Sequence, residues 1–110
     1  VKMLRKTADV TFKAENECLT AFVCGEIDHH AARDVRYMID MEMAKAHPGT
    51  LALDLSGVSF MDSSGLGLIL GRYNKATELG IGFTVKKPSQ SASRIIKAAG
   101  AGRIIKIEEN

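Results

Sequence analysis

The alternation of apolar and polar residues near the start of the chain predicts a β-hairpin. Residues 10–15, VTFKAE, place apolar side chains at every second position, as a half-buried strand does. Residues 18–24, CLTAFVC, form a second candidate strand, and the Asn-Glu pair between the two segments indicates a turn. A turn this short makes the two strands antiparallel neighbours. The polar stretch GEIDHH that follows, residues 25–30, is predicted to be a loop.

Three later segments carry apolar residues at helical spacing. The first is residues 31–47, whose charged residues, Asp40 among them, lie away from the apolar face. The third begins after Pro88 and Ser89 and ends at the glycine-rich AGAG. The second is residues 64–79, with Gly80 ending it. Its predicted buried face consists of Leu66, Ile69, Leu70, Tyr73 and Ala76.

Short apolar strands separate these helices and define the fold class. Residues 50–55, TLALDL, are typical of a central strand that is buried on both faces, and residues 81–86 and 103–107 add two more strands. The order is therefore β-β-α-β-α-β-α-β. It predicts one α/β domain over residues 1–110, with three helices and a mixed, mostly parallel sheet of about five strands that begins with the hairpin.

Composition narrows the classes of partner. The formal net charge is +2 and aromatic residues make up 5% of the 110 residues, which argues against direct nucleic-acid binding. No apolar run is long enough to span a bilayer, so no membrane partner is expected. Within one strand Cys18 and Cys24 would lie about 20 Å apart, too far for a disulfide. We interpret them as free thiols that behave as small core residues in a reducing, cytoplasmic compartment.

The stretch SFMDSSGLGLILG, residues 59–71, is the strongest local anomaly. It follows a buried strand and opens a helix, yet its first turns contain two serines and two glycines. Asp62 or Ser63 can cap the helix, and the free N–H groups there attract anions. The pattern alone therefore leaves two interpretations, a simple cap and a binding site. Gly65 and Gly67 favour a helix start that is open to close approach, whereas Gly71 is explained by close packing of the helix on the sheet.

Known catalytic and nucleotide-binding motifs do not fit this stretch. It lacks the Gly-Lys-Ser/Thr of a P-loop, and GLGLILG is not the dinucleotide fingerprint. Ser63, Asp28 and His29 or His30 supply the residue types of a hydrolase, but the nucleophile elbow requires glycine where Met61 stands, which argues against hydrolase activity. The two histidines have no second cluster with metal-ligand spacing. The sequence therefore predicts no catalytic residue, no metal site and no cofactor.

Two segments together resemble a known family. GEIDHH (25–30) and SFMDSSGLGLILGRYNK (59–75) are similar to the anti-sigma factor antagonists of the STAS-domain family, in particular to their sporulation branch. The resemblance implies a phosphorylation switch and not an enzyme. Its implied partners are an anti-sigma factor that is also a serine kinase with bound nucleotide, and a metal-dependent serine phosphatase. The unphosphorylated form would bind the kinase and release the sigma factor.

The resemblance also assigns the site residues. Ser63 corresponds to the phosphorylated serine, and Asp28 to the acidic residue beside it. Asp62, Ser64, Gly65 and Leu66 fall where the family meets its partner, and the two aspartates would make the modified patch strongly anionic. The alternative is a STAS module that senses a nucleotide or small anion at the same helix N-terminus.

The chain departs from the family pattern near its end. Relatives usually carry a further C-terminal helix, whereas this sequence ends at IEEN, shortly after its last predicted strand. Sporulation relatives have a Leu-Phe pair where this sequence has AGAG, residues 99–102. Both differences concern partner contacts at that end and leave the Ser63 region unchanged.

Overall fold

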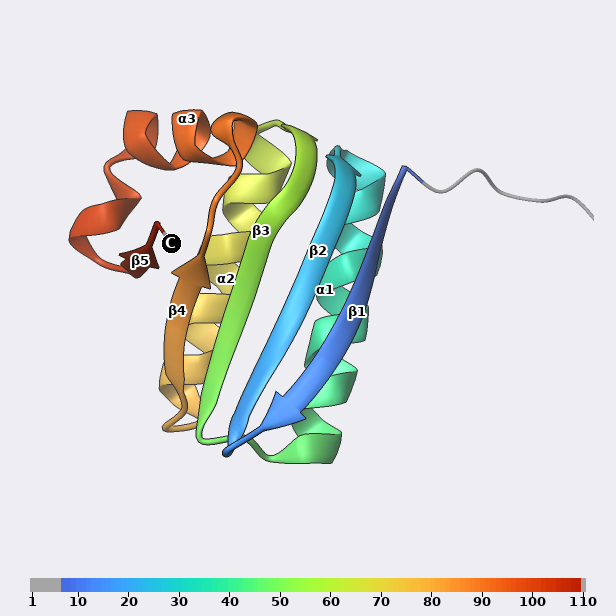
Figure 1. Cartoon of the computed structure of the whole chain (residues 1–110), viewed down its shortest axis with the longest axis vertical. Coiled ribbons are helices and arrows are strands. Elements are labelled where there is room, and N and C mark those ends of the chain that lie inside the picture. Colours follow the sequence, from blue (N-terminus) through green and yellow to red (C-terminus); the bar gives the residue numbers. More distant parts are fainter. Residues whose placement is uncertain (1–6, 110) are drawn as a thin grey trace, which may run out of the picture.

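The computed structural model describes residues 7–109 and alternates strands with helices as the sequence predicts. In chain order the elements are β1 (Ala8–Glu15), β2 (Cys18–Ile27), α1 (His29–Ala46), β3 (Thr50–Met61), α2 (Ser63–Glu78), β4 (Gly82–Lys86), α3 (Gln90–Ala99), a 3-10 helix (Ala101–Arg103) and β5 (Lys106–Glu108). The predicted α/β class is confirmed, with a five-stranded sheet and three α-helices in the described range (Figure 1).

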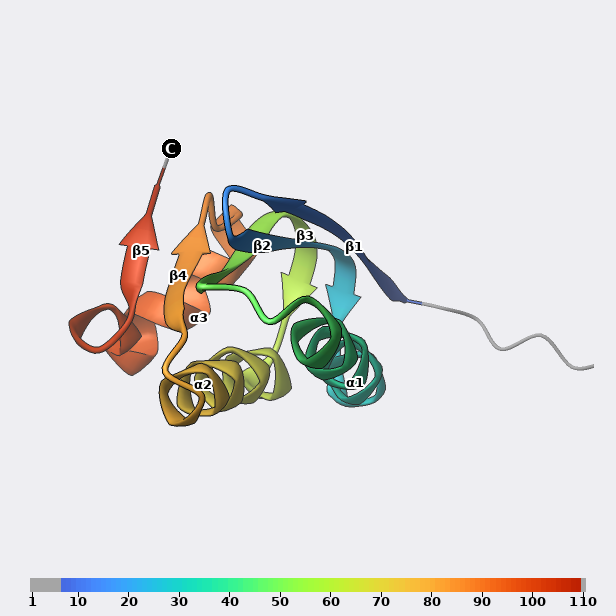
Figure 2. The same cartoon turned by 90° about the horizontal axis from the view of Figure 1, so that it is seen from below.

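The sheet places its strands in sequence order, β1-β2-β3-β4-β5. β1 and β2 form the predicted antiparallel hairpin, and the three following pairs are parallel. Because successive crossovers have the same hand and the order never reverses, α1 and α2 lie on the same face of the sheet (Figure 2). A sheet without a reversal has no topological switch point, where open α/β folds form their ligand crevice.

The main core lies between this helix layer and the sheet. In β2 the alternate residues Leu19, Ala21, Val23 and Ile27 are buried. All five residues of 51–55 in β3 are also buried, as the leucine-rich pattern predicts. α1 contributes Val35, Ile39 and Met43 to the same core. Residues 51–55 include Asp54, whose Oδ1 accepts hydrogen bonds from the backbone N (3.0 Å) and Oγ (2.7 Å) of Ser56. Local hydrogen bonds therefore compensate the burial of this carboxylate.

The predicted loop at residues 25–30 is wrong, because β2 continues to Ile27 and α1 begins at His29. β3 likewise extends to Met61, where it pairs with Ile27. The extension follows from parallel pairing, in which each strand satisfies the backbone groups of the other. The register shifts around Gly25, whose φ of 96° and close approach to the backbone of residue 7 favour glycine.

α2 is rotated relative to the face that its apolar residues predict. Its buried residues are Gly65, Leu68, Ile69, Arg72 and Ala76, while Leu66, Leu70 and Tyr73 are half-buried. The helix packs closely at Gly65, where a Cβ would overlap the Met61 side chain. A Cβ at Gly71 would meet nothing within 4 Å, so the close packing that the sequence assigned to Gly71 belongs to Gly65.

The C-terminal region and the cysteines also differ from expectation. The last strand covers only Lys106–Glu108, because Ala101–Arg103 forms a 3-10 helix within the segment between α3 and β5. Cys18 and Cys24 are both free, as predicted, but Cys24 is exposed and Cys18 is half-buried. Their predicted role as core residues is therefore wrong. Both lie on the face of β2 opposite to the buried Leu19 and Val23.

A buried ion pair joins the two helices of the layer. Arg72 Nη1 of α2 lies 3.1 Å from Asp40 Oδ1 of α1, and the Arg72 side chain is only 8% exposed. The position of Asp40 in the helical pattern predicted that it faces away from the fold. This prediction is wrong, because Asp40 faces α2. Burial lowers the pKa of Arg72, while the Asp40 carboxylate opposes this shift and Arg36 adds to it. Within the described residues, Arg72 Nε and Nη1 have no hydrogen-bond partner, so Asp40 is the compensating charge.

Removing that charge should destabilise the fold. We expect Asp40→Ala to lower the free energy of unfolding by about 2 kcal/mol, because it leaves a buried guanidinium without a counter-charge. Urea unfolding followed by circular dichroism measures the effect. Glu78→Ala, at an exposed position of α2, is the control and should change stability by less than about 0.5 kcal/mol. Equal stability of Asp40→Ala and the wild type would contradict the role of this pair.

Candidate functional site

The N-termini of α1 and α2 lie beside each other at one edge of the sheet. Ile27 and Met61, the last residues of β2 and β3, are paired, and the backbone N of Asp62 approaches the carbonyl of Ile27 at 3.4 Å. Each strand is followed by one aspartate and then by a helix. The parallel register therefore brings Asp28 and Asp62 to the same edge.

Both aspartates are N-caps. Asp28 Oδ1 accepts a hydrogen bond from the backbone N of Ala31 at 2.9 Å, and Asp62 Oδ1 accepts one from the backbone N of Ser64 at 2.8 Å. The sequence allowed either Asp62 or Ser63 to cap α2, and in the structure the cap is Asp62. The carboxylates satisfy backbone donors that the first turn of a helix leaves unpaired. Ser63 is thereby released from capping.

Ser63 is the first residue of α2 and is exposed. Its hydroxyl makes no hydrogen bond with other residues in the described range, 7–109. Ser64 is half-buried and borders the groove between α1 and α2. Of the two serines, Ser63 presents the more accessible hydroxyl, and it does so at the positive end of the helix dipole.

The two glycines of the first turns differ in environment. Gly67 is exposed, and a Cβ there would meet nothing within 4 Å. Gly65 is buried, and a Cβ would lie 2.7 Å from Met61 Sδ and 3.3 Å from Ile27 Cγ2. The interpretation of both glycines as open surface is therefore corrected for Gly65, which allows the helix start to pack on the strand ends. Leu66 beside it is half-buried.

A basic groove adjoins this surface and was missed by the sequence analysis. It has a volume of about 320 Å³, and its lining residues are His29, Ala32, Arg33, Arg36, Ser64, Gly67 and Leu68. Arg33 and Arg36 therefore line the same groove as Ser64, so basic residues adjoin the patch for which Asp28 and Asp62 predict a strongly anionic character. The repeat of His29, Arg33 and Arg36 along one flank of α1 is the sequence signal that could have revealed it.

Phe60 is a second residue that the sequence analysis did not single out. It lies on β3 beside Glu26 of β2, and 48% of its surface is exposed. It precedes Ser63 by three residues and lies on the face of β3 opposite to the buried Met61, which packs against α2. Aromatic side chains in such positions commonly anchor protein partners.

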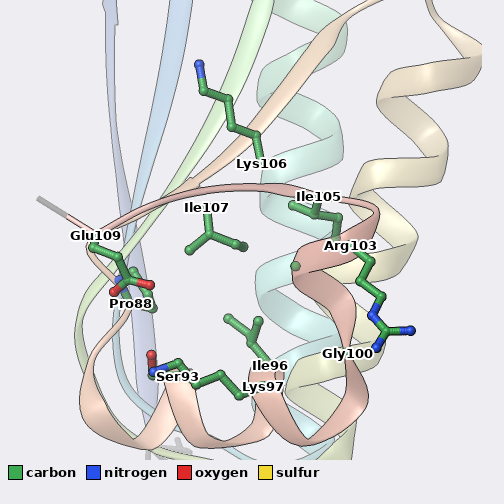
Figure 3. Close-up of a pocket in the computed structure, with 11 residues that line it drawn as sticks. Pro88, Ser93, Ile96, Lys97, Gly100, Arg103, Ile105, Lys106, Ile107 and Glu109 are labelled. Atoms are coloured by element: carbon green, nitrogen blue, oxygen red, sulfur yellow. The ribbon is translucent and has the colours of Figure 1, made fainter.

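A separate hollow lies between α3, the 3-10 helix and β5 (Figure 3). It has a volume of about 420 Å³ and shares no lining residue with the groove beside Ser64. Ile96, Ile105 and Ile107 point into it, whereas Arg103 and Lys106 extend away (Figure 3). Its lining also includes the polar residues Ser93, Lys97 and Glu109. In residues 7–109, moreover, no three His, Cys, Asp or Glu side chains form a potential metal site.

The family model for the STAS domain matches residues 9–110. The chain belongs to the STAS-domain family. Among curated relatives of this STAS domain, an anti-sigma F factor antagonist from Paenibacillus polymyxa is 35% identical over 86 residues, which are 78% of this chain and 74% of that protein. The family membership predicted from the two sequence segments is thus confirmed.

Solved structures agree with the fold. The unphosphorylated form of the anti-sigma factor antagonist SpoIIAA has a TM-score of 0.75 and 26% identity, with 90% of this chain and 87% of that chain covered. The phosphorylated form of SpoIIAA from Bacillus has a TM-score of 0.70 and 26% identity, with 90% of each chain covered. In the described part of this STAS domain, none of the helices combines the length and apolarity that a bilayer crossing requires.

Proposed function

We propose that this STAS domain is an anti-sigma factor antagonist that is controlled by phosphorylation of Ser63. In its unphosphorylated form it binds an anti-sigma factor, which then releases its sigma factor. The observation that carries the proposal is the exposed hydroxyl of Ser63 at the start of α2, directly after the Asp62 cap. The similarity to SpoIIAA, whose structures include both phosphorylation states, supports it.

The chemistry of the site explains how one phosphate can act as a switch. Phosphorylation adds about −1.5 to −2 charge at pH 7. The first turn of α2 tolerates that charge because of the helix dipole, so the fold need not change. The phosphate group would lie close to the carboxylates of Asp28 and Asp62. It would add both negative charge and volume to a small docking surface. A partner that fits the free hydroxyl would lose complementarity and meet an additional desolvation cost.

The docking surface in this proposal surrounds Ser63. It comprises Asp28, Asp62, Ser64, Gly65 and Leu66, with Gly65 contributing through its effect on the helix start and not through exposed surface. Phe60 adds an exposed ring at the end of β3. We propose that the partner is an anti-sigma factor with serine kinase activity and bound nucleotide, and that a metal-dependent phosphatase restores Ser63.

The domain itself acts in this proposal as a binding protein, with no catalytic residue of its own. The hydroxyl of Ser63 is without a hydrogen-bonded base among residues 7–109, which offers no support for an esterase. Cytoplasmic localisation is part of the proposal, because the two free cysteines suit a reducing compartment. The nucleotide- or anion-sensing alternative is less well supported, since the strand order creates no switch-point crevice.

Phosphate mapping tests the modified residue directly. We expect incubation with the cognate anti-sigma kinase and Mg-ATP to add one phosphate, which mass spectrometry should locate on Ser63. Ser63→Ala should abolish the modification, whereas Ser64→Ala should retain it as the matched control. Phosphate on Ser64 alone, or none on either serine, would contradict the proposal.

A further inference from the structure

The flank of α1 that faces away from α2 carries an exposed stripe. The stripe consists of the exposed residues Asp34, Tyr37, Met38, Met41 and Lys45 and the half-buried Glu42, which recur at spacings of three and four residues along three helical turns. Arg36 and Asp40, by contrast, belong to the flank that faces α2. α1 lies at the edge of the helix layer, with α2 on one side only (Figure 2).

Apolar side chains concentrate on this stripe. Tyr37 is 64% exposed, Met41 54% and Met38 39%, and these are three of the seven large exposed hydrophobic residues in the described range. Isolated exposed apolar residues are common on proteins, but a contiguous set rimmed by charges is typical of an interaction surface. Methionine adapts its flexible side chain to a partner surface and is common at such contacts.

The sequence of the stripe is self-complementary. We propose that α1 pairs with α1 of a second copy of this chain, antiparallel, around a two-fold axis midway between Ile39 and Asp40. In a two-fold interface each contact occurs twice, with the residue roles exchanged. This axis places Asp34 opposite Lys45 of the partner copy and Met38 opposite Met41, while Tyr37 and Glu42 lie on opposite margins of the stripe.

Each of these pairings is chemically favourable. Asp34 and Lys45 have opposite charges, so each copy places its carboxylate opposite the ammonium group of the other. The two methionine pairs form the apolar centre. In one copy Lys45 makes only a long contact with Glu42, 3.8 Å, and Asp34 has no ionic partner within residues 7–109. Both charges are therefore available for a second copy. A parallel pairing would instead bring like charges together.

The size of the stripe sets the strength of this dimer. Three helical turns bury less than the roughly 1,200 Å² of most stable complexes, so we expect a weak dimer with a Kd on the order of 100 µM. The interface does not include Ser63 or the basic groove of α1 and α2. The dimer would present two Ser63 surfaces, and the inference does not depend on the function proposed for them.

Exchanging the charges between two variants provides the decisive test. Sedimentation velocity of the full chain over a concentration series should show a monomer–dimer equilibrium for the wild type. Asp34→Lys and Lys45→Asp should each weaken self-association at least about tenfold, because like charges then face each other twice. An equimolar mixture of the two variants should associate as the wild type does, since both opposite-charge pairs are restored in the heterodimer.

A second pair of variants tests the apolar centre. Met41→Lys should weaken association by at least about tenfold, whereas Ile104→Lys, at a residue that is 60% exposed outside α1, should leave it unchanged. Circular dichroism checks that all variants fold. A wild type that stays monomeric up to about 1 mM, tenfold above the expected Kd, would overturn the proposal. Failure of the mixture to restore association would do the same.

Discussion

Replacing Ser63 by aspartate should weaken binding to the cognate anti-sigma factor at least about 30-fold, which corresponds to about 2 kcal/mol. The reason is the position of the hydroxyl. Ser63 is exposed at the start of α2, and the capping carboxylates of Asp28 and Asp62 lie at the same edge of the sheet. A third negative charge at this edge must lose its hydration when a partner docks. A partner surface that is complementary to a hydroxyl supplies no positive charge to compensate for that loss.

Matched variants separate this effect from a general effect of charge. Ser63→Ala removes only the hydroxyl and should bind within about threefold of the wild type, a difference below 1 kcal/mol. Asn74→Asp adds the same charge at an exposed position further along α2 and should also bind normally. Titration calorimetry with the purified anti-sigma factor measures all three. Unchanged affinity of Ser63→Asp would refute the proposed role of Ser63.

The loss of binding should occur without loss of the fold. An aspartate in the first turn of a helix interacts favourably with the dipole, by about 0.3–1 kcal/mol, and this offsets repulsion from Asp62. Ser63→Asp should therefore unfold in urea close to the wild-type midpoint. If the variant lost both stability and binding, the binding result would not report on docking, so the two measurements belong together.

Gly65→Val should lower the free energy of unfolding by about 3 kcal/mol, the largest stability effect that we expect from a single substitution near the site. A Cβ at this position would overlap the side chain of Met61 and lie 3.3 Å from Ile27 Cγ2. Both neighbours are almost fully buried, so they have little room to move. The slight gain in helix propensity over glycine is too small to offset this overlap.

Gly67→Val is the control, two residues further along the same helix. Its Cβ would meet nothing within 4 Å, so we expect a stability within about 0.5 kcal/mol of the wild type or slightly above it. Chemical unfolding of both variants, compared by midpoint and slope, gives the difference. Similar stability of the two valine variants would show that Gly65 is not a site of obligatory close packing.

The pairing of two helix N-termini gives this edge of the sheet its character. Asp28 and Asp62 are 34 positions apart in the sequence but occupy equivalent places, each after a strand that pairs with the other. Because Asp62 caps α2, the Ser63 hydroxyl is exposed, and it forms no hydrogen bond with other residues of the range 7–109. The basic groove with Arg33 and Arg36 then borders the acidic side, so the surface has two signs of charge side by side. Such a pattern favours orientation of a partner as well as attraction.

Local sequence signals determined much of this protein. Alternation and helical periodicity gave the order of the elements, and the glycine, serine and aspartate pattern of residues 59–71 gave the start of α2. These signals are short-ranged, because the period of an element and the chemistry of a cap depend on neighbouring residues. The likeness of two segments to the STAS family added the candidate role of Ser63, which the spacing alone did not supply.

Tertiary structure decided what depends on residues far apart in the chain. The parallel register of β2 and β3 extended both strands and moved the start of α1, while the Arg72–Asp40 pair and the contact of Gly65 with Met61 set which face of α2 is buried. The charge of the site changed too, because only packing of α1 beside α2 brings Arg33 and Arg36 close to Ser64. Sequence periodicity defines a helix but not its rotation or its neighbours, since those follow from which side chains fit together in the core.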